Sequence, residues 1–281
     1  MKKVKISIPA KVNLTLDILG VCDGYHNIES LVTSVNIYDK VILTKRTDKQ
    51  VTLKELGIKP KIEKEKNNAY IAAKKFIETF NTLGVDIELK KNISVGAGLG
   101  GSSADIAAII LGMVKLYGVK RDVSKFAAAL GSDVNYMMCG GYAVMRNKGE
   151  IIEKIRSKER LYLLLVIAEK EILTKECYEE YDRQAKTYPQ ATKMATTLLA
   201  CKDKENLIKT FKNDLYYAAK KLYPKIETNA KTLEKYAKTV LTGSGSCVCG
   251  VFKSKQERNK VYKKLYPIFK EKIIKAKTCK K

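Results

Sequence analysis

The sequence predicts an α+β protein with two lobes. Helical and strand-like patterns are mixed in both halves of the chain, and no low-complexity linker separates the halves. With 281 residues and 45% hydrophobic composition, the chain can bury one large core or two smaller ones. A charged stretch at 155–159 precedes a strand-like segment. We therefore expect an N-terminal domain over residues 1–156 and a C-terminal domain over residues 157–281.

The first half contains strands that alternate with amphipathic helices. The pattern near Asp39 predicts an interruption in the third strand, and the charged segment 44–66 has little periodicity. Asn68 is a candidate cap for the first helix. The expected elements are strands over 4–8, 12–18, 31–43, 85–89 and 141–146, with helices over 69–81, 104–117 and 123–130.

The second half is richer in helical patterns. Apolar residues recur there at helical spacing in several segments, and one apolar segment with a central glycine turn predicts a pair of strands. The expected elements are a strand over 161–167, helices over 177–186, 191–200, 206–211 and 223–236, a strand–turn–strand unit over 239–252, and a helix from 255.

Composition excludes several classes of protein. The seven cysteines are scattered without a C-x-x-C pair, and His26 is the only histidine, so we expect neither a zinc site nor a disulfide framework. No apolar run is long enough to cross a bilayer, and the N-terminus lacks the pattern of a signal peptide. These features predict a cytoplasmic protein without membrane contacts.

The net charge of +24 raises the question of a nucleic-acid partner. The lysines are spread along the chain and form no nucleic-acid-binding signature, so no such partner is expected. A positive field of this kind would attract multiply phosphorylated small molecules.

The most informative segment is the glycine loop, residues 95–103, which reads Val-Gly-Ala-Gly-Leu-Gly-Gly-Ser-Ser and precedes an Ala-rich apolar run. Glycine allows a ligand to approach the backbone, and a helix N-terminus provides unpaired N–H groups and partial positive charge. The loop lacks the Lys-Ser/Thr of a P-loop and the acidic ribose partner of a dinucleotide fingerprint. It is therefore a candidate phosphate site, and a tight structural turn is the alternative.

Three segments together resemble the GHMP kinase superfamily, which includes galactokinase, homoserine kinase and mevalonate kinase. They are Pro-Ala-Lys-Val-Asn-Leu at 9–14, the glycine loop, and Leu-Thr-Gly-Ser-Gly-Ser-Cys at 241–247. Asp-Gly-Tyr-His at 23–26 resembles one branch of this superfamily, whose members phosphorylate an alcohol that carries a cytidine diphosphate. Gly-Ser-Asp-Val at 131–134 and Asn-Asp-Leu at 213–215 resemble the same branch. The matches occur in the family's order over nearly the whole chain.

The resemblance implies a fold and a reaction. The fold is a two-lobed GHMP kinase fold, with an N-terminal lobe like the second domain of ribosomal protein S5 and a ferredoxin-like C-terminal lobe. The reaction is transfer of phosphate from ATP, with Mg²⁺ as cofactor, to the 2-hydroxyl of a cytidyl-diphosphate-linked methylerythritol in the non-mevalonate route to isoprenoid precursors. The expected partners are these two small molecules, and the expected assembly is a monomer or weak homodimer.

The resemblance also implies roles for individual residues. Asp133 is the catalytic base and Lys11 its partner, which keeps the carboxylate ionised and offsets charge in the transition state. The substrate is contacted by Asn13 near its polar end and by Tyr25, His26 and Tyr178 at the nucleobase, through stacking and hydrogen bonds. The residues expected to bind ATP are Val95, Gly96, Ala97, Gly98, Leu99, Gly100, Gly101, Ser102, Ser103 and Asn68.

The chain departs from the family pattern at four positions. Ser102 stands where the family has its third glycine, and Ala104 where it has a second serine. The sequence alone therefore leaves open which of Ser102 and Ser103 contacts phosphate. Ser94 and Asn135 replace prolines, which removes backbone stiffening but no reactive group.

Two alternative functions are left open. A GHMP kinase for another small alcohol would use the same loop, although the segment at 23–26 argues against it. A basic RNA-binding protein that has kept only the kinase-like fold is the second alternative. Salt-dependent RNA binding without ATP turnover would favour it.

Overall fold

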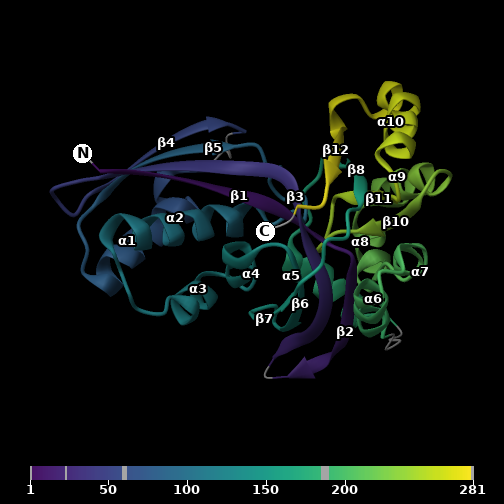
Figure 1. Cartoon of the computed structure of the whole chain (residues 1–281), viewed down its shortest axis with the longest axis horizontal. Coiled ribbons are helices and arrows are strands. Elements are labelled where there is room, and N and C mark those ends of the chain that lie inside the picture. Colours follow the sequence, from purple (N-terminus) through teal and green to yellow (C-terminus); the bar gives the residue numbers. More distant parts are fainter. Residues whose placement is uncertain (1, 23, 59–61, 185–189, 280–281) are drawn as a thin grey trace. The chain divides into compact units, whose positions relative to one another are not determined.

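The computed structural model of the chain describes residues 2–22, 24–58, 62–184 and 190–279, and it confirms the α+β class (Figure 1). The chain forms two compact units, each built from separate segments. The first unit comprises Met1–Ala10, Ile37–Val95 and Gly100–Cys139, and the second comprises Lys11–Asn36, Gly96–Leu99 and Gly140–Lys281. The expected division at residue 156 cuts the chain once, whereas the compact units combine separate segments. The predicted domain boundary stays a prediction.

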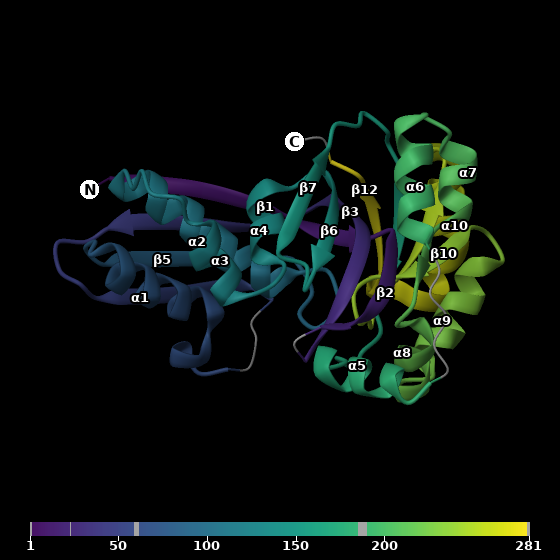
Figure 2. The same ribbon diagram turned by 90° about the horizontal axis from the view of Figure 1, so that it is seen from below.

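In the first unit, two helices cover a sheet. The last residues of β3 pair antiparallel with β5, and β5 pairs parallel with β4. Helices α1 and α2 lie side by side on one face of these strands (Figures 1 and 2). The elements are β1 (Lys3–Asn13), β3 (Tyr25–Lys45), β4 (Val51–Gly57), η1 (Lys64–Lys66), α1 (Asn68–Phe80), β5 (Val85–Lys91), α2 (Gly101–Tyr117), α3 (Ser124–Leu130) and α4 (Val134–Cys139).

Helix α2 is the central element of this unit. Most of its residues are buried, including Ala104, Ile106, Ile109 and Ile110. A helix that is apolar on nearly all sides must be enclosed by other elements, and α2 packs against α1 and α4, while its Gly112 lies against Leu43 of β3. Its N-terminus, where the glycine loop ends, is therefore fixed by the core.

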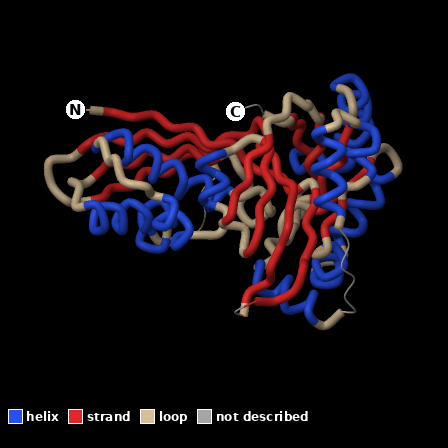
Figure 3. Tube along the Cα trace, turned by 60° about the horizontal axis from the view of Figure 1, so that its bottom comes forward, coloured by secondary structure: helices blue, strands red, loops and turns tan. Residues whose placement is uncertain are grey.

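The second unit contains a long hairpin and two sheets. β2 (Thr15–Cys22) and β3 are antiparallel, with Ile18 opposite Ile28 and Val21 opposite His26, and their strands run side by side in Figure 3. This hairpin continues into a sheet in the order β7-β6-β3-β2-β9. The additional strands are β6 (Tyr142–Asn147), β7 (Ile151–Ile155) and β9 (Lys212–Asn213).

The other sheet of the second unit is antiparallel, in the order β10-β11-β8-β12. Helices α9 and α10 pack against it (Figure 1). The strands are β8 (Tyr162–Val166), β10 (Lys238–Leu241), β11 (Val248–Phe252) and β12 (Ile273–Lys277). The helices are α5 (Thr174–Asp182), α6 (Ala191–Ala200), α7 (Lys204–Lys209), α8 (Tyr216–Leu222), α9 (Lys225–Glu234), α10 (Lys255–Phe269) and η2 (Lys270–Lys272).

Several local expectations were wrong. β1 continues through Pro9, and β3 runs without a break through Asp39. Asn67, not Asn68, caps α1, because the Asn67 side chain accepts a hydrogen bond from the Ala69 N–H at 2.9 Å. Residues 185–186, at the end of the helix expected over 177–186, lie outside the described residues. The elements that the pattern did not predict are β4, α4, β7, β9, α8, β12 and the short 3-10 helices η1 and η2.

Among the described residues, none of the helices combines the length and the apolar character needed to cross a membrane.

Candidate active site

Asn13 is the centre of a hydrogen-bond network in the second unit. Its Oδ1 accepts from Lys11 Nζ at 2.7 Å and from the Gly243 N–H at 3.0 Å, and its Nδ2 donates to Ser30 Oγ at 2.7 Å. Its own backbone N–H donates to Thr242 Oγ1 at 3.1 Å. Both polar atoms of this buried amide are thus used within the protein. The observed contacts are those of a residue that positions Lys11, and the expected contact with substrate stays a prediction.

The first part of the glycine loop is bonded to the segment 241–247. Gly98 O accepts from Thr242 Oγ1 at 3.2 Å, and Ala97 O accepts from the Cys247 N–H at 3.3 Å. The next carbonyl, that of Leu99, accepts from the Lys11 N–H at 3.0 Å. Three segments that are far apart in the sequence therefore meet at this loop.

Gly98 is required by this arrangement for two reasons. Its φ of +73° lies in the left-handed region, which side chains rarely adopt. A Cβ atom on Gly98 would also lie 2.1 Å from the backbone oxygen of Thr242. The close approach of two backbones here is possible only for glycine.

The segment at 213–215 is hydrogen-bonded to the segment 241–247. Asn213 Nδ2 donates to the carbonyl oxygens of Leu241 and Gly243, at 2.8 Å each, and Asn213 Oδ1 accepts from the Leu215 N–H at 2.9 Å. Asp214 Oδ2 accepts from the Ile18 N–H at 3.0 Å. The Gly243 N–H is thus bonded to Asn13, and the Gly243 carbonyl oxygen to Asn213.

In the first unit, the glycine loop ends at the N-terminus of α2. Gly100 is the N-cap, with φ +75°, and it offers no side chain to close the helix end. Asn68 Nδ2 donates to Ser102 Oγ, and Ser103 Oγ lies 3.9 Å from the position that a Cβ of Gly131 would take. The structure therefore brings Asn68 to the loop. It also places Ser103 beside Gly131.

Asp133 is half-buried and directly precedes α4, where its carbonyl accepts from the Met137 N–H at 2.9 Å. It belongs to the first unit, as do Ser103 and Gly131. Lys11 is buried, with 5% of its surface exposed, and belongs to the second unit. The expected pairing of Lys11 with Asp133 stays a prediction.

The expected nucleobase ligands are only partly brought together. His26 and Tyr178 are stacked, with ring centroids 4.5 Å apart and planes inclined by 27°. Tyr25 lies instead beneath Lys148, whose Nζ is 3.6 Å from the ring centroid, because neighbouring residues of a strand point to opposite faces. Asp23, which begins this segment, lies outside the described residues.

Two further residues of this cluster were not predicted. Tyr181 meets the His26 ring edge-on at 6.2 Å, and Asp182 Oδ1 lies 2.9 Å from His26 Nε2. Both are on α5, three and four residues after Tyr178, and this spacing places side chains on one face of a helix. Because the pattern predicted this helix, the spacing from Tyr178 was the signal in the sequence that could have identified Tyr181 and Asp182.

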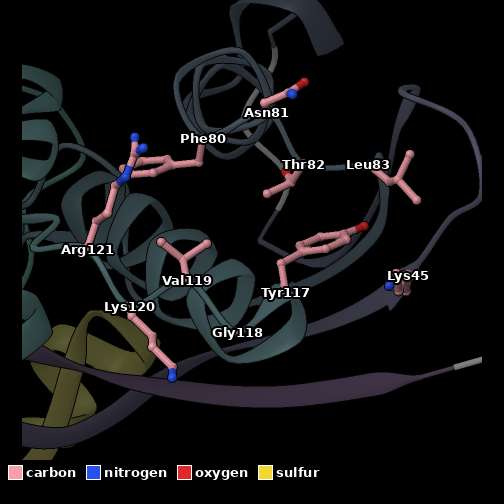
Figure 4. A pocket seen from close by; sticks show the side chains of 10 residues that line it. All are labelled: Lys45, Phe80, Asn81, Thr82, Leu83, Tyr117, Gly118, Val119, Lys120 and Arg121. Atoms are coloured by element: carbon pink, nitrogen blue, oxygen red, sulfur yellow. The ribbon is translucent and has the colours of Figure 1, made fainter.

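A separate cavity of about 470 Å³ lies in the first unit, at the C-terminal ends of α1 and α2. Figure 4 shows its lining, in which Phe80, Thr82, Tyr117, Val119 and Arg121 surround the space. α2 has 17 residues, so this end lies ~25 Å from the glycine loop. The cavity is therefore distinct from the candidate active site.

The described part of the chain contains no cluster of three or more His, Cys, Asp or Glu side chains that could hold a metal ion. The polar groups of the glycine loop are its backbone groups and the hydroxyls of Ser102 and Ser103.

Two family models match the chain: "GHMP kinases N terminal domain" over residues 67–144 and "GHMP kinases C terminal" over residues 200–270. They define the class of protein as the GHMP kinases, and they contain α2 with its preceding glycine loop and the 213–215 segment, respectively. A crystal structure of 4-(cytidine 5'-diphospho)-2C-methyl-D-erythritol kinase superimposes with a TM-score of 0.81 at 23% identity, covering 99% of this chain and 100% of that one.

Similar proteins of known name identify the family within the GHMP kinases. The 4-diphosphocytidyl-2-C-methyl-D-erythritol kinase of Syntrophomonas wolfei is 33% identical over 278 residues, covering 96% of each chain. The enzyme of that name from Clostridium tetani is 32% identical and covers 96% of this chain and 99% of its own. The chain belongs to the 4-diphosphocytidyl-2-C-methyl-D-erythritol kinase family. A mevalonate kinase from L. major shares the fold, with a TM-score of 0.77 at 17% identity, covering 98% of this chain and 95% of that one.

Proposed function

We propose that this protein transfers the terminal phosphate of ATP to the 2-hydroxyl of 4-diphosphocytidyl-2-C-methyl-D-erythritol, a step of the non-mevalonate route to isoprenoid precursors. The observation that carries the proposal is the network at Asn13, which links Lys11 to Gly243 and lies beside the glycine loop. The names of the curated relatives support the same reaction.

The glycine loop and the N-terminus of α2 bind the phosphates of ATP. Backbone N–H groups and the positive end of the helix stabilise their negative charge, and Ser103 contributes a hydroxyl. ATP enters as its magnesium complex, in which Mg²⁺ neutralises part of the charge on the transferred phosphate. Asn68 holds Ser102 by a hydrogen bond, which leaves Ser103 as the serine that contacts phosphate.

Asp133 accepts the proton of the attacking hydroxyl, and Lys11 offsets the negative charge that develops during transfer. Asn13 supports Lys11 by fixing its ammonium group, so that little reorganisation is needed when substrate arrives. Without this hydrogen bond the Lys11 side chain could rotate, and the rate of phosphate transfer would fall.

His26 and Tyr178 bind the cytosine ring. The stacked pair offers an aromatic face and an imidazole edge, which together suit a planar base with hydrogen-bonding atoms on its rim. Tyr25 stays a predicted nucleobase ligand on the same strand. Recognition of the cytidyl group distinguishes this protein from kinases of mevalonate or homoserine.

The test is a coupled assay of ADP formation with the cytidyl substrate, with 2-C-methyl-D-erythritol 4-phosphate, which lacks the cytidyl group, and with mevalonate. We expect turnover with the first compound only. Equal turnover with mevalonate would assign the protein to another GHMP kinase activity, and salt-dependent RNA binding without turnover of any alcohol would overturn the kinase assignment.

The matched variants are Asp133→Asn and Asp122→Asn. Asp122 is an exposed carboxylate in the same unit that accepts hydrogen bonds from the backbone N–H and the hydroxyl of Ser124, the first residue of α3. Loss of a catalytic base lowers kcat by about 10²–10⁴-fold, whereas loss of the Asp122 carboxylate leaves kcat nearly unchanged. If Asp133→Asn retains normal turnover, the assignment of the base is wrong.

A further inference from the structure

A buried ion cluster in the first unit lies at the base of the glycine loop. Lys91 Nζ is 2.9 Å from Asp39 Oδ2 and 2.5 Å from Asp105 Oδ2. The side chains of Lys91, Asp39 and Asp105 are 4%, 0% and 7% exposed, respectively. None of them belongs to the residues that the family resemblance assigned to catalysis or binding.

The cluster connects the segment that enters the glycine loop with the helix that leaves it. Lys91 is the last residue of β5, Asp105 lies in the second turn of α2, and Asp39 lies in β3. Asp39 Oδ1 also accepts the N–H groups of Asn92 at 2.6 Å and of Ile93 at 2.9 Å. One ammonium group therefore fixes both ends of the loop against the sheet.

The packing under the loop depends on the same contacts. A Cβ on Gly101 would lie 3.1 Å from Ile93 Cγ2, so the first residue of α2 rests directly on the chain that Asp39 holds. A shift of Ile93 would displace Gly101, and with it the N–H groups at the start of the helix. The position of the anion site is thus coupled to the cluster.

We propose that Lys91 is a positioning residue for nucleotide binding: with Asp39 and Asp105 it presets the separation of the two ends of the glycine loop. The proposal rests on the function proposed above, because it takes the loop to be the site of the ATP phosphates. It does not place Lys91 in contact with ATP.

Chemistry favours a positioning role over a purely stabilising one. Burial of three charged groups costs desolvation free energy, and apolar residues of similar volume often give equal or greater stability. An ion cluster, however, has directional bonds that allow one arrangement of β3, β5 and α2. Such specificity is useful where a loop must meet phosphate with fixed geometry.

The cluster also has an excess of negative charge, because two carboxylates share one ammonium. Asp105 Oδ1 is buried and has no hydrogen-bond partner among the described residues. Burial, opposed by Lys91 and reinforced by Asp39, raises the pKa of Asp105 to about 7. Lys91 and Asp39 are the charged groups that act on the Asp105 carboxyl group.

Nucleotide affinity should therefore respond to pH near neutrality. Asp105 lies one helical turn beyond Ser102, close to the predicted phosphate site, and an anion there disfavours the ionised form of Asp105. Binding of nucleotide then takes up part of a proton. Affinity rises as the pH falls from about 8 to about 6, on either side of the Asp105 pKa, and this dependence requires the Asp105 carboxyl group.

The experiment measures binding of ADP with Mg²⁺ by titration calorimetry, without the alcohol substrate, for the variants Lys91→Met, Lys91→Arg and Asp105→Asn. Lys90→Met is the matched control, because Lys90 is the exposed neighbour of Lys91 on β5. We expect Kd to increase about tenfold or more for Lys91→Met, but less than about threefold for Lys91→Arg and Lys90→Met. Thermal unfolding of each variant reports whether it is folded.

Asp105→Asn keeps the volume of the side chain and remains testable if Lys91→Met fails to fold. The unmodified protein should show a lower Kd in the acidic than in the alkaline buffer. We expect this difference to be smaller for Asp105→Asn, because only the titration of the ligand itself, which is common to both proteins, then remains. The proposal is overturned if Lys91→Met, once shown to be folded, binds ADP normally. It is also overturned if Asp105→Asn keeps the full pH dependence. Turnover with the cytidyl substrate is measured separately, so failure of the proposed function is distinguished from failure of the positioning role of Lys91.

Discussion

Lys11 and Asn13 point to the same side of β1, two residues apart, and the lysine Nζ donates to the asparagine Oδ1 at 2.7 Å. The same oxygen accepts the Gly243 N–H at 3.0 Å. A single amide oxygen therefore sets the position of a buried ammonium group and the conformation of a turn that is 230 residues away. Removal of this amide should disturb both places at once.

Replacement of Asn13 by Ala should lower kcat more than it alters the KM for ATP. Lys11 Nζ would lose the acceptor that orients it, and a misplaced catalytic group costs about 10- to 100-fold in rate. Asn213→Ala is the control, because Asn213 also holds Gly243 but does so through backbone oxygens. Both variants should lose about 1–3 kcal/mol of stability. Steady-state kinetics at fixed temperature would contradict the assignment if the two kcat values fell equally.

Gly98→Ala and Gly118→Ala should separate steric conflict from backbone strain. Both glycines have positive φ, of +73° and +68°, but a Cβ on Gly98 would meet the Thr242 backbone oxygen at 2.1 Å, whereas a Cβ on Gly118 would meet open space. Gly118→Ala should cost about 1 kcal/mol. Gly98→Ala should cost several times more and abolish nucleotide binding, as measured by urea unfolding and calorimetry. Equal costs would mean that the loop relaxes freely away from Thr242.

Tyr178→Ala should raise the KM for the cytidyl substrate and leave the KM for ATP unchanged. The His26 ring would lose its stacked partner, and aromatic pairs of this kind contribute about 0.5–1.5 kcal/mol beyond their buried area. We therefore expect an increase of roughly 10-fold or less in KM. Tyr217→Ala, an exposed tyrosine on α8, is the control. A parallel rise in the KM for ATP would place the aromatic pair elsewhere in the reaction.

The Asp105 carboxyl should make the unmodified protein less stable as pH rises from about 4 to about 7. Its pKa in the folded chain is raised to about 7 from the ordinary 3.8, so the folded state binds more protons than the unfolded state in this window. Asp105→Asn removes this contribution, which is at most about 4 kcal/mol. Urea unfolding at about pH 5 and about pH 8 should show a smaller loss of stability for the variant. An unchanged loss would place the folded pKa of Asp105 near its ordinary value.

Asp39 illustrates what the sequence could and could not predict. A charged residue within an apolar alternation usually marks the end of a strand, and the pattern predicted an interruption there. In the structure, Lys91 and two backbone N–H groups satisfy the Asp39 carboxylate, so the strand remains continuous and buried. These partners lie 52 to 54 residues further along the chain, and a local pattern does not contain them.

The glycine loop and its helix were predictable for the opposite reason. Their signal is local, since glycines, serines and an Ala-rich apolar run follow one another without interruption. The one-residue error at the cap of α1 arose because Asn67 and Asn68 are both good caps and only the folded backbone distinguishes them. The elements β4, α4, β7, α8 and β12 are short, and β4 and β7 are largely exposed, so their patterns are weak.

The hydrogen bond between Thr242 and Gly98 joins residues that are 144 positions apart. A nascent chain that ends before residue 242 lacks the donor that shapes the loop, however well α2 has formed. The chain should thus become able to bind a nucleotide only late in synthesis, after the segment 241–247 has left the ribosome. Contacts of such long range slow the search for the native topology. A protease-sensitive intermediate with a complete α2 and an unformed loop is the species to look for in time-resolved refolding.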